Sequence, residues 1–225
     1  MHIVLFCVTL FWCSYLDAHS MPSGGDWGLG RVAAVFLRGT EDLLIDSCTF
    51  EKLDGSAVLL NKYNRHATIQ NNNFHEIGEN MIGLLGETEG VPEAYGMGWD
   101  GTNGDQPRFT RVLKNFAYRC GLFEKQSSFY FQAKSAQNTI KDNIFFHGPR
   151  AGMNFNDGFG GGSLVEGNLM FNTVMESGDH GPFNSVCITS SVSLCPVCVW
   201  CDWCRRSTTL VMIVSYCCSG IGKFT

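Results

Sequence analysis

Two acidic residues in glycine-flanked motifs are the first candidates for chemistry in this chain. Asp157 lies in Asn-Asp-Gly, and Asp179 lies in Gly-Asp-His-Gly. Hydrolysis of a glycosidic bond needs two carboxyl groups, about 5–5.5 Å apart for retention of configuration or about 6.5–9.5 Å apart for inversion. We expect Asp157 and Asp179 to come within this range on successive units of a repeat, with Glu176 and Glu87 as alternates. Bend residues that only bond backbone are the competing interpretation.

A second chemistry, β-elimination from a uronic acid, needs a base beside the C5 proton and a cation that neutralises the carboxylate. Lys134 or Arg150 could serve in this reaction, with His147 or His180 as a helper. The net charge of −5 at pH 7 does not favour a polyanionic substrate. We therefore place lyase activity slightly behind hydrolysis, and glycan binding or a surface-structural role without catalysis close behind both.

Amide and aromatic side chains gather near these candidates. They occupy equivalent positions of short strand-like segments, so we expect them on consecutive coils in one exposed patch with Lys134 and Asp157. Amides and an aromatic ring on a rigid sheet suit the hydroxyl groups and rings of an extended polysaccharide. Solvated side chains without a ligand are the alternative. The predicted binding residues are Tyr130, Gln132, Asn154, Asn156, His180 and Asn184.

A repeated phrase indicates the scaffold that must position these residues. The pattern apolar-x-x-Asn-x-apolar recurs about every 25 residues. Its copies begin at Ile69, Val112, Ile140 and Val165, with a degenerate copy at Ile45. A fixed period of this size is typical of a solenoid, in which each repeat buries its face against the next.

A second phrase of about five residues precedes each copy and has the length of a short strand. Neither phrase shows helical periodicity, so stacked parallel strands predict an all-β parallel β-helix. Alternation along each strand assigns two faces. The column predicted to point inward is Leu37, Leu60, Leu85, Phe131, Phe155 and Phe183. The columns predicted to point outward include Tyr130 with Asn154, and Gln132 with Asn156 and Asn184.

The repeated asparagines are predicted to be structural. Asn tolerates left-handed backbone and bonds neighbouring backbone groups, so it suits a bend. Stacked on successive coils, Asn72, Asn115, Asn143 and Asn168 would satisfy one another. The longest interval between copies carries an insertion at about residues 87–107, which we expect to form a loop on one face.

Composition bounds the class of protein. The 225 residues suit one domain of moderate size, and 26 glycines with 17 phenylalanines fit many bends and stacked aromatic rings. No basic run appears, so we expect no nucleic-acid partner. No segment is long and apolar enough to predict a membrane span.

The two ends of the chain depart from the repeat. Residues 1–20 resemble the apolar region of a signal peptide or a partial first coil, and a secreted or cell-surface location follows from the former. We assign residues 21–185 to the β-helix. Residues 186–225 are rich in cysteine, carry no repeat and follow the last strand phrase directly, so we expect them to lie outside the fold, which would leave the solenoid incomplete at its C-terminal end.

We expect no metal or other cofactor. The run Cys195-Pro-Val-Cys198-Val-Trp-Cys201-Asp-Trp-Cys204 has superficially metal-like spacing, but it lacks the two separated pairs typical of zinc sites. Calcium bound through Asp100 or Asp105 could assist a lyase, yet no compact acidic cluster appears around them.

Several unbroken stretches resemble a known superfamily. The segment from about Ala18 to Ser185 resembles the right-handed single-stranded parallel β-helix proteins of the pectate-lyase-like superfamily, and more narrowly a β-helix family of microbial eukaryotes. The matching stretches are residues 22–27, 98–102, 124–128, 131–134, 154–162 and 176–185.

This resemblance implies a right-handed β-helix and an activity on polysaccharides, since the superfamily acts mostly as lyases, hydrolases or epimerases. The motif Glu176-Ser-Gly-Asp179-His-Gly is similar to an acidic motif of some bacterial β-helix glycosidases, which implies a catalytic Asp179. Fold does not fix function, so hydrolase, lyase and binding protein all stay open.

Overall fold

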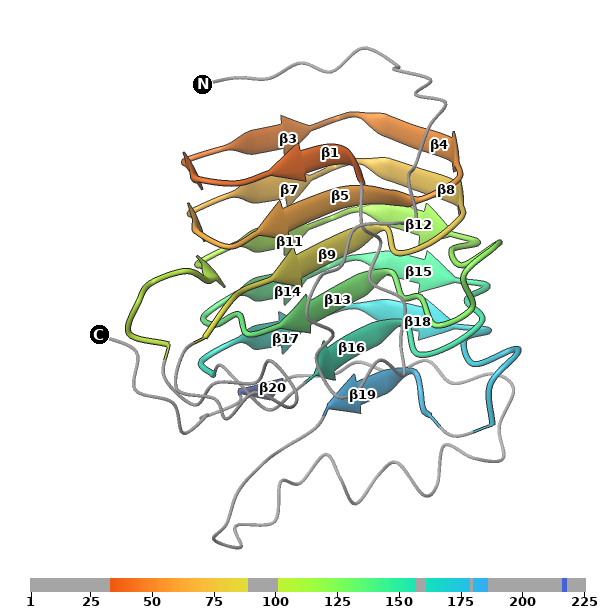
Figure 1. Ribbon diagram of the computed structural model, residues 1–225. Helices are drawn as coiled ribbons and strands as arrows, with labels where there is room; N and C mark the ends of the chain where they lie inside the picture. Colours follow the sequence, from red (N-terminus) through yellow and green to blue (C-terminus); the bar gives the residue numbers. More distant parts are fainter. Residues whose placement is uncertain (1–32, 89–100, 157–160, 179, 186–215, 218–225) are drawn as a thin grey trace, which may run out of the picture.

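The computed structural model describes residues 33–88, 101–156, 161–178, 180–185 and 216–217. Within these ranges the chain winds through successive coils, and each short strand stacks on the equivalent strand of the next coil (Figure 1). The pairings among β1 to β19 are parallel. The predicted all-β parallel β-helix is therefore confirmed. These ranges contain no helix that could cross a membrane.

Each of the first five coils contributes one strand to each of three long sheets, and β19 and β20 are added to the first and second sheet. Sheet 1 contains β1 (Ala33–Leu37), β5 (Ser56–Asn61), β9 (Ile82–Leu85), β13 (Tyr130–Ala133), β16 (Met153–Asn156) and β19 (Phe183–Ser185). Sheet 2 contains β3 (Leu44–Asp46), β7 (Thr68–Gln70), β11 (Arg111–Leu113), β14 (Thr139–Lys141), β17 (Leu164–Glu166) and β20 (Tyr216–Cys217). Sheet 3 contains β4 (Thr49–Leu53), β8 (Asn73–Ile77), β12 (Phe116–Tyr118), β15 (Ile144–Phe146) and β18 (Leu169–Phe171).

Two smaller features complete the strand order. A short sheet at the corner between sheets 1 and 2 contains β2 (Thr40–Glu41), β6 (Asn64–Arg65) and β10 (Pro107–Arg108). Strand β20, from the cysteine-rich C-terminal segment, pairs with β17 in the antiparallel direction. The rest of that segment, like residues 1–32, lies outside the described ranges.

The bend between sheets 2 and 3 repeats the same backbone conformation on every coil. The residue before each ladder position has a positive φ, a region that Asn, Asp and Gly enter more readily than most residues. These residues are Ser47, Asn71, Lys114, Asp142 and Gly167, with φ between 52° and 66°. The left-handed residue turns the chain sharply, so the following side chain points into the bend.

The predicted asparagine ladder fills this bend. The Oδ1 atom of Asn115 accepts hydrogen bonds from the backbone nitrogen and the Nδ2 atom of Asn72, both at 3.0 Å. Oδ1 of Asn143 accepts the same two hydrogen bonds from Asn115, both at 2.9 Å. Oδ1 of Asn168 accepts them from Asn143 at 3.0 and 2.8 Å. Each Nδ2 also donates to a carbonyl of the preceding coil, and these carbonyls belong to Ile45, Ile69, Val112 and Ile140.

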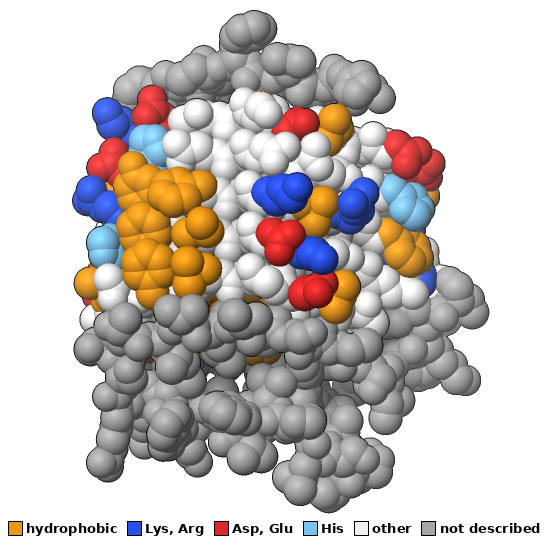
Figure 2. Space-filling model, turned by 180° about the vertical axis from the view of Figure 1, so that it is seen from behind, with side chains coloured by type: hydrophobic (Ala, Val, Ile, Leu, Met, Phe, Trp, Pro, Cys, Tyr) orange, Lys and Arg blue, Asp and Glu red, His pale blue; other side chains and the backbone are white. Residues whose placement is uncertain are grey.

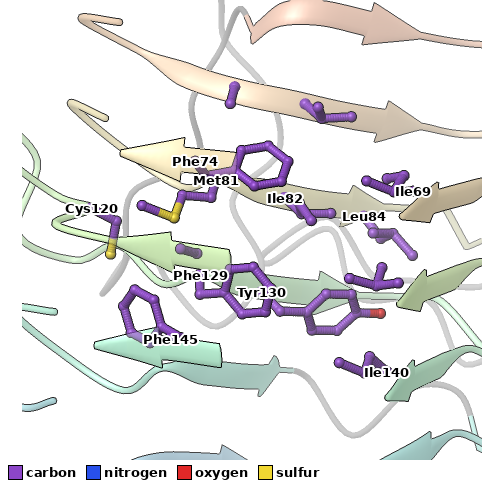
Figure 3. Packing of buried hydrophobic residues seen from close by; sticks show 14 of the residues in the cluster. Ile69, Phe74, Met81, Ile82, Leu84, Cys120, Phe129, Tyr130, Ile140 and Phe145 are labelled. Atoms are coloured by element: carbon purple, nitrogen blue, oxygen red, sulfur yellow. The ribbon is translucent and has the colours of Figure 1, made fainter. Parts of the chain in front are cut away.

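Inward-facing side chains of the three sheets form one continuous core. Its members include stacked rings, such as Phe129 and Phe145, with centroids 5.5 Å apart. Figure 3 shows these rings together with Ile69, Ile82 and Tyr130 in the interior of the coils. Stacking at strand spacing keeps this core close-packed along the whole solenoid.

The register of sheet 1 corrects one sequence prediction. Leu60 pairs with Leu84 rather than Leu85, and Leu84 pairs with Gln132. Leu85 and Phe131 consequently belong to a second apolar cluster on the outer face of the sheet, with Ala33, Leu59 and Ala133. Both faces of these strands are buried, so hydrophobic alternation could not identify the inward face.

Candidate functional site

The corrected register moves two predicted binding residues into the core. Tyr130 pairs with Ile82 and Met153, and its ring is fully buried among them. Its hydroxyl donates a hydrogen bond of 2.8 Å to Oε1 of Gln132, which points inward as well. Burial raises the pKa of the Tyr130 hydroxyl above its ordinary value. Neither side chain is part of an exposed patch, so this part of the prediction was wrong.

Gln132 joins a polar network at the inner corner between sheets 1 and 2. Nδ2 of Asn138 donates to Oε1 of Gln132 at 3.2 Å and to Oγ of Ser135 at 2.8 Å. The Ser135 hydroxyl in turn donates to the carbonyl of Pro107 at 2.6 Å. Because these groups satisfy one another without solvent, we interpret the network as structural.

The amides of β16 and β19 do lie on the outer face of sheet 1. Asn154 and Asn184 occupy paired positions, and Nδ2 of Asn184 donates to Oδ1 of Asn154 at 2.8 Å. Asn156 lies on the same face, two residues further along β16. The side chains of Asn154 and Asn156 are nonetheless buried, which contradicts the predicted exposure of this amide patch.

Lys134 is also buried. It follows β13 directly, has a positive φ of 50° and is only 2% exposed. Its carbonyl lies close against Gly86, where an added Cβ would come within 2.0 Å of the oxygen. Because Lys134 is buried and interacts with neighbouring groups, it is not the solvent-facing base that the lyase interpretation requires.

The predicted carboxylate pair, Asp157 and Asp179, lies outside the described residues. The neighbours of these aspartates are described: Asn156 ends β16, whereas His180 stands before the start of β19. These two strands run parallel, so Asn156 and His180 belong to opposite ends of sheet 1. The pairing of the two carboxylates stays a prediction from the sequence.

The alternative catalytic groups are distributed among separate contacts. The exposed Glu176 carboxylate forms an ion pair of 2.9 Å with Lys125. Glu87 pairs with Lys62 at 2.7 Å. His180 contacts Arg150 through Nε2, near the beginning of the sheet 1 strands and thus at the other end from Lys134. Asp100 is not among the described residues, and those that are described include no group of three or more metal-binding side chains.

A column of stacked aromatic rings runs along the outer face of sheet 3. His75 stacks on Tyr118 with centroids 5.2 Å apart, Tyr118 stacks on Phe146 at 5.3 Å, and Phe146 stacks on Phe171 at 4.8 Å. The interplanar angles lie between 3° and 14°. We call these four side chains the aromatic ladder. Seen from behind, the hydrophobic side chains form one patch over sheet 3 (Figure 2).

A second outward column lies beside the aromatic ladder. It contains Phe116, Ile144 and Leu169, two residues before Tyr118, Phe146 and Phe171 on the same strands. Phe116 is 42% exposed and Ile144 is 36% exposed. The ring of Phe116 meets those of Tyr118 and Phe146 edge-on, at 63° and 64°. The two columns together form a partly exposed, mainly apolar platform on a rigid sheet, which we call the sheet 3 platform.

Charged groups border the sheet 3 platform in pairs. At one end of the aromatic ladder, a carboxylate oxygen of Glu51 lies 3.2 Å from Nε2 of His75, and beside the platform Arg119 binds Glu76 at 2.9 Å. The outer face of sheet 2 is different, because it carries charges in its centre, including the Lys141–Glu166 ion pair at 3.0 Å. An uncharged, partly apolar ligand therefore fits sheet 3 better than sheet 2.

Sequence reasoning missed the aromatic ladder, although its signal is present. Each ladder residue stands three positions after an asparagine of the repeat: His75 after Asn72, Tyr118 after Asn115, Phe146 after Asn143 and Phe171 after Asn168. The repeated phrase apolar-x-x-Asn-x-apolar ends at the apolar residue two positions after the asparagine. That residue points inward, so the third position must point outward.

Comparison with known proteins gives one family. A family model described as a right-handed β-helix region matches residues 33–194. No significant match appears among curated proteins or solved structures. The matched region includes the strands of the sheet 3 platform.

Proposed function

We propose that this chain, which belongs to the right-handed β-helix family, binds an extended polysaccharide on the outer face of sheet 3. The observation that carries the proposal is the aromatic ladder on four consecutive strands, with Phe116 and Ile144 exposed beside it. Sugar rings present apolar C–H faces that pack favourably on aromatic side chains, and a rigid sheet loses little conformational entropy when it binds them.

We favour binding on the sheet 3 platform over binding on the amides of sheet 1, and over catalysis, for a physical reason. Asn154 and Asn156 are buried, so a glycan could reach them only after a rearrangement, whereas the sheet 3 platform is partly exposed, with Phe116 and Ile144 as its most exposed side chains. Hydrolysis would require the pairing of Asp157 and Asp179, which is a prediction from their sequence motifs. A polysaccharide ligand also implies an extracellular or cell-surface location.

Affinity electrophoresis of the full chain through gels that contain soluble polysaccharides would test the proposal. We expect retardation by at least one polysaccharide and its loss in Tyr118→Ala. The matched control is Leu164→Ala, since Leu164 is 37% exposed on the outer face of sheet 2 and should not affect retardation. Migration unaffected by every polysaccharide would remove the function proposed.

The same samples separate binding from catalysis. New reducing ends after incubation would indicate hydrolysis, and ultraviolet absorbance of an unsaturated sugar would indicate elimination. Retardation without either product supports binding alone. If hydrolysis occurs, its loss in both Asp157→Asn and Asp179→Asn would restore the acid pair as the catalytic centre.

A further inference from the structure

The spacing of the aromatic ladder limits which polysaccharide can bind it. We propose that the ligand is a neutral, extended, β-linked glycan that lies parallel to the solenoid axis with one sugar ring on each coil. This inference rests on the proposed binding function and names the class and direction of the ligand.

The first argument is the repeat distance. Neighbouring rings of the ladder are 5.2, 5.3 and 4.8 Å apart, because hydrogen-bonded strands fix this spacing at about 4.8 Å. One pyranose of an extended β-1,4-linked chain advances by nearly one such strand spacing. Successive sugars would therefore meet equivalent side chains, whereas an α-linked chain that coils would leave the platform after the first contacts.

The second argument is the shape of the surface. Rings with centroids 4.8–5.3 Å apart lie farther apart than the roughly 3.5–4.0 Å of atoms in full face-to-face contact, and each ring of the ladder is partly exposed. The column of Phe116 and Ile144 lies two residues away along the strands, or about 7 Å. This width suits one flat sugar ring, and the edge-on contacts of Phe116 hold its ring in place.

The third argument is charge. From β12 to β18 the two columns consist of Phe116, Tyr118, Ile144, Phe146, Leu169 and Phe171, and none of these side chains is charged. A carboxylated or sulfated glycan would lose solvation on this surface without a cation in its centre. A neutral glycan would keep its hydroxyl groups toward solvent and the paired ions at the border, such as Arg119 with Glu76.

Titration calorimetry with β-1,4-glucan oligosaccharides of increasing length tests the direction of binding. We expect the affinity to rise about three- to tenfold per sugar up to four sugars, one for each ring of the ladder, and then to level off. Carboxymethylcellulose, as an acidic β-1,4-linked probe, and dextran, as a neutral α-linked probe, should bind at least about tenfold more weakly.

Each outcome has a distinct meaning. Equal binding of the acidic or α-linked probe, or an affinity independent of length, would overturn this inference while the binding function stands. Failure of every polysaccharide to bind would remove both.

Variants locate the ligand on the sheet 3 platform. Phe116→Ala and Ile144→Ala should each weaken tetrasaccharide binding by about three- to tenfold, with Leu164→Ala as the unaffected control. Circular dichroism melting curves would check that all variants are folded. Sedimentation analysis tests whether a second copy of the chain covers this face instead. If the parent chain forms a dimer and binds no glycan, and Phe116→Ala dissociates the dimer, the face is a dimer interface and the proposal is overturned.

Discussion

The asparagine ladder and the aromatic ladder are two columns built from one repeated phrase, and they have opposite environments. Asn143 and Phe146 are three residues apart on the same coil, yet the amide is buried and the ring lies on the outer surface. Amides in the bend are saturated by hydrogen bonds of 2.8–3.1 Å from coil to coil. Rings on sheet 3 touch one another only through dispersion contacts of modest strength.

This difference separates residues that hold the coils together from residues free to bind a ligand. A buried amide that loses its partner leaves donors and acceptors unsatisfied, and each costs about 1–3 kcal/mol. An exposed ring that is removed leaves only water in its place. We therefore expect substitutions in the bend to change stability and substitutions on sheet 3 to change binding.

The largest effect should come from Asn115→Ala. Without this side chain, the backbone nitrogen and the Nδ2 atom of Asn72 lose their acceptor, and Oδ1 of Asn143 loses one donor. We expect the free energy of unfolding to fall by about 2–6 kcal/mol. Urea denaturation followed by circular dichroism would measure it. Asn73→Ala, beside the ladder but facing outward, should cost no more than about 0.5 kcal/mol; equal losses would contradict the structural role of the ladder.

The same substitution at two tyrosines gives the next largest contrast. Tyr130→Phe removes a buried hydroxyl that donates to Gln132, so we expect a loss of about 1–2 kcal/mol. Tyr118→Phe keeps the stacked ring on the outer face and should change stability by no more than about 0.5 kcal/mol. Thermal denaturation of the pair would decide the register, because similar stabilities would place Tyr130 outside the core.

The sequence allowed the prediction of those parts of the fold that repeat at fixed spacing. The Asn72, Asn115, Asn143 and Asn168 phrases located the bend, and the parallel stacking followed from their period. The inward position of Leu37 and Leu60 was correct as well, since both belong to the core.

The face of each strand in sheet 1 could not be predicted in the same way. Strands β9 and β13 are buried on both faces, and Leu84 and Leu85 are both apolar. The sequence therefore does not reveal a shift of one residue in the pairing register. That shift placed Tyr130 and Gln132 outside when they lie inside. In sheet 3 only one face is buried, so alternation along these strands is enough to predict that the aromatic ladder points outward.

The interior and the surface should also differ in their response to pH. Burial raises the pKa of the Cys120 thiol from 9.0 to about 12, so the folded state keeps a proton that the unfolded state releases in this window. Stability is thus unaffected below about pH 9 and falls above it, by about 1 kcal/mol per pH unit. Urea titrations at increasing pH should show this slope. Cys120→Ala should flatten it between pH 9 and pH 10. Above the ordinary tyrosine pKa of 10, buried Tyr130 also contributes to the slope. An unchanged slope in Cys120→Ala would contradict the burial of this thiol.

The smallest effect concerns the first described position of the asparagine ladder, where a cysteine stands. The backbone nitrogen of Cys48 already donates to Oδ1 of Asn72 at 2.9 Å, as each ladder asparagine does to the next. In Cys48→Asn the new Nδ2 would donate to the same oxygen, so we expect a gain of about 0.5–1 kcal/mol and a higher Tm. Cys48→Ala, which adds no donor, should not stabilise the fold. Lower stability of Cys48→Asn than of Cys48→Ala would mean that a ladder amide also needs a carbonyl of the preceding coil, as Ile45 provides for Asn72. The asparagine ladder would then be cooperative across coils instead of a sum of independent pairs.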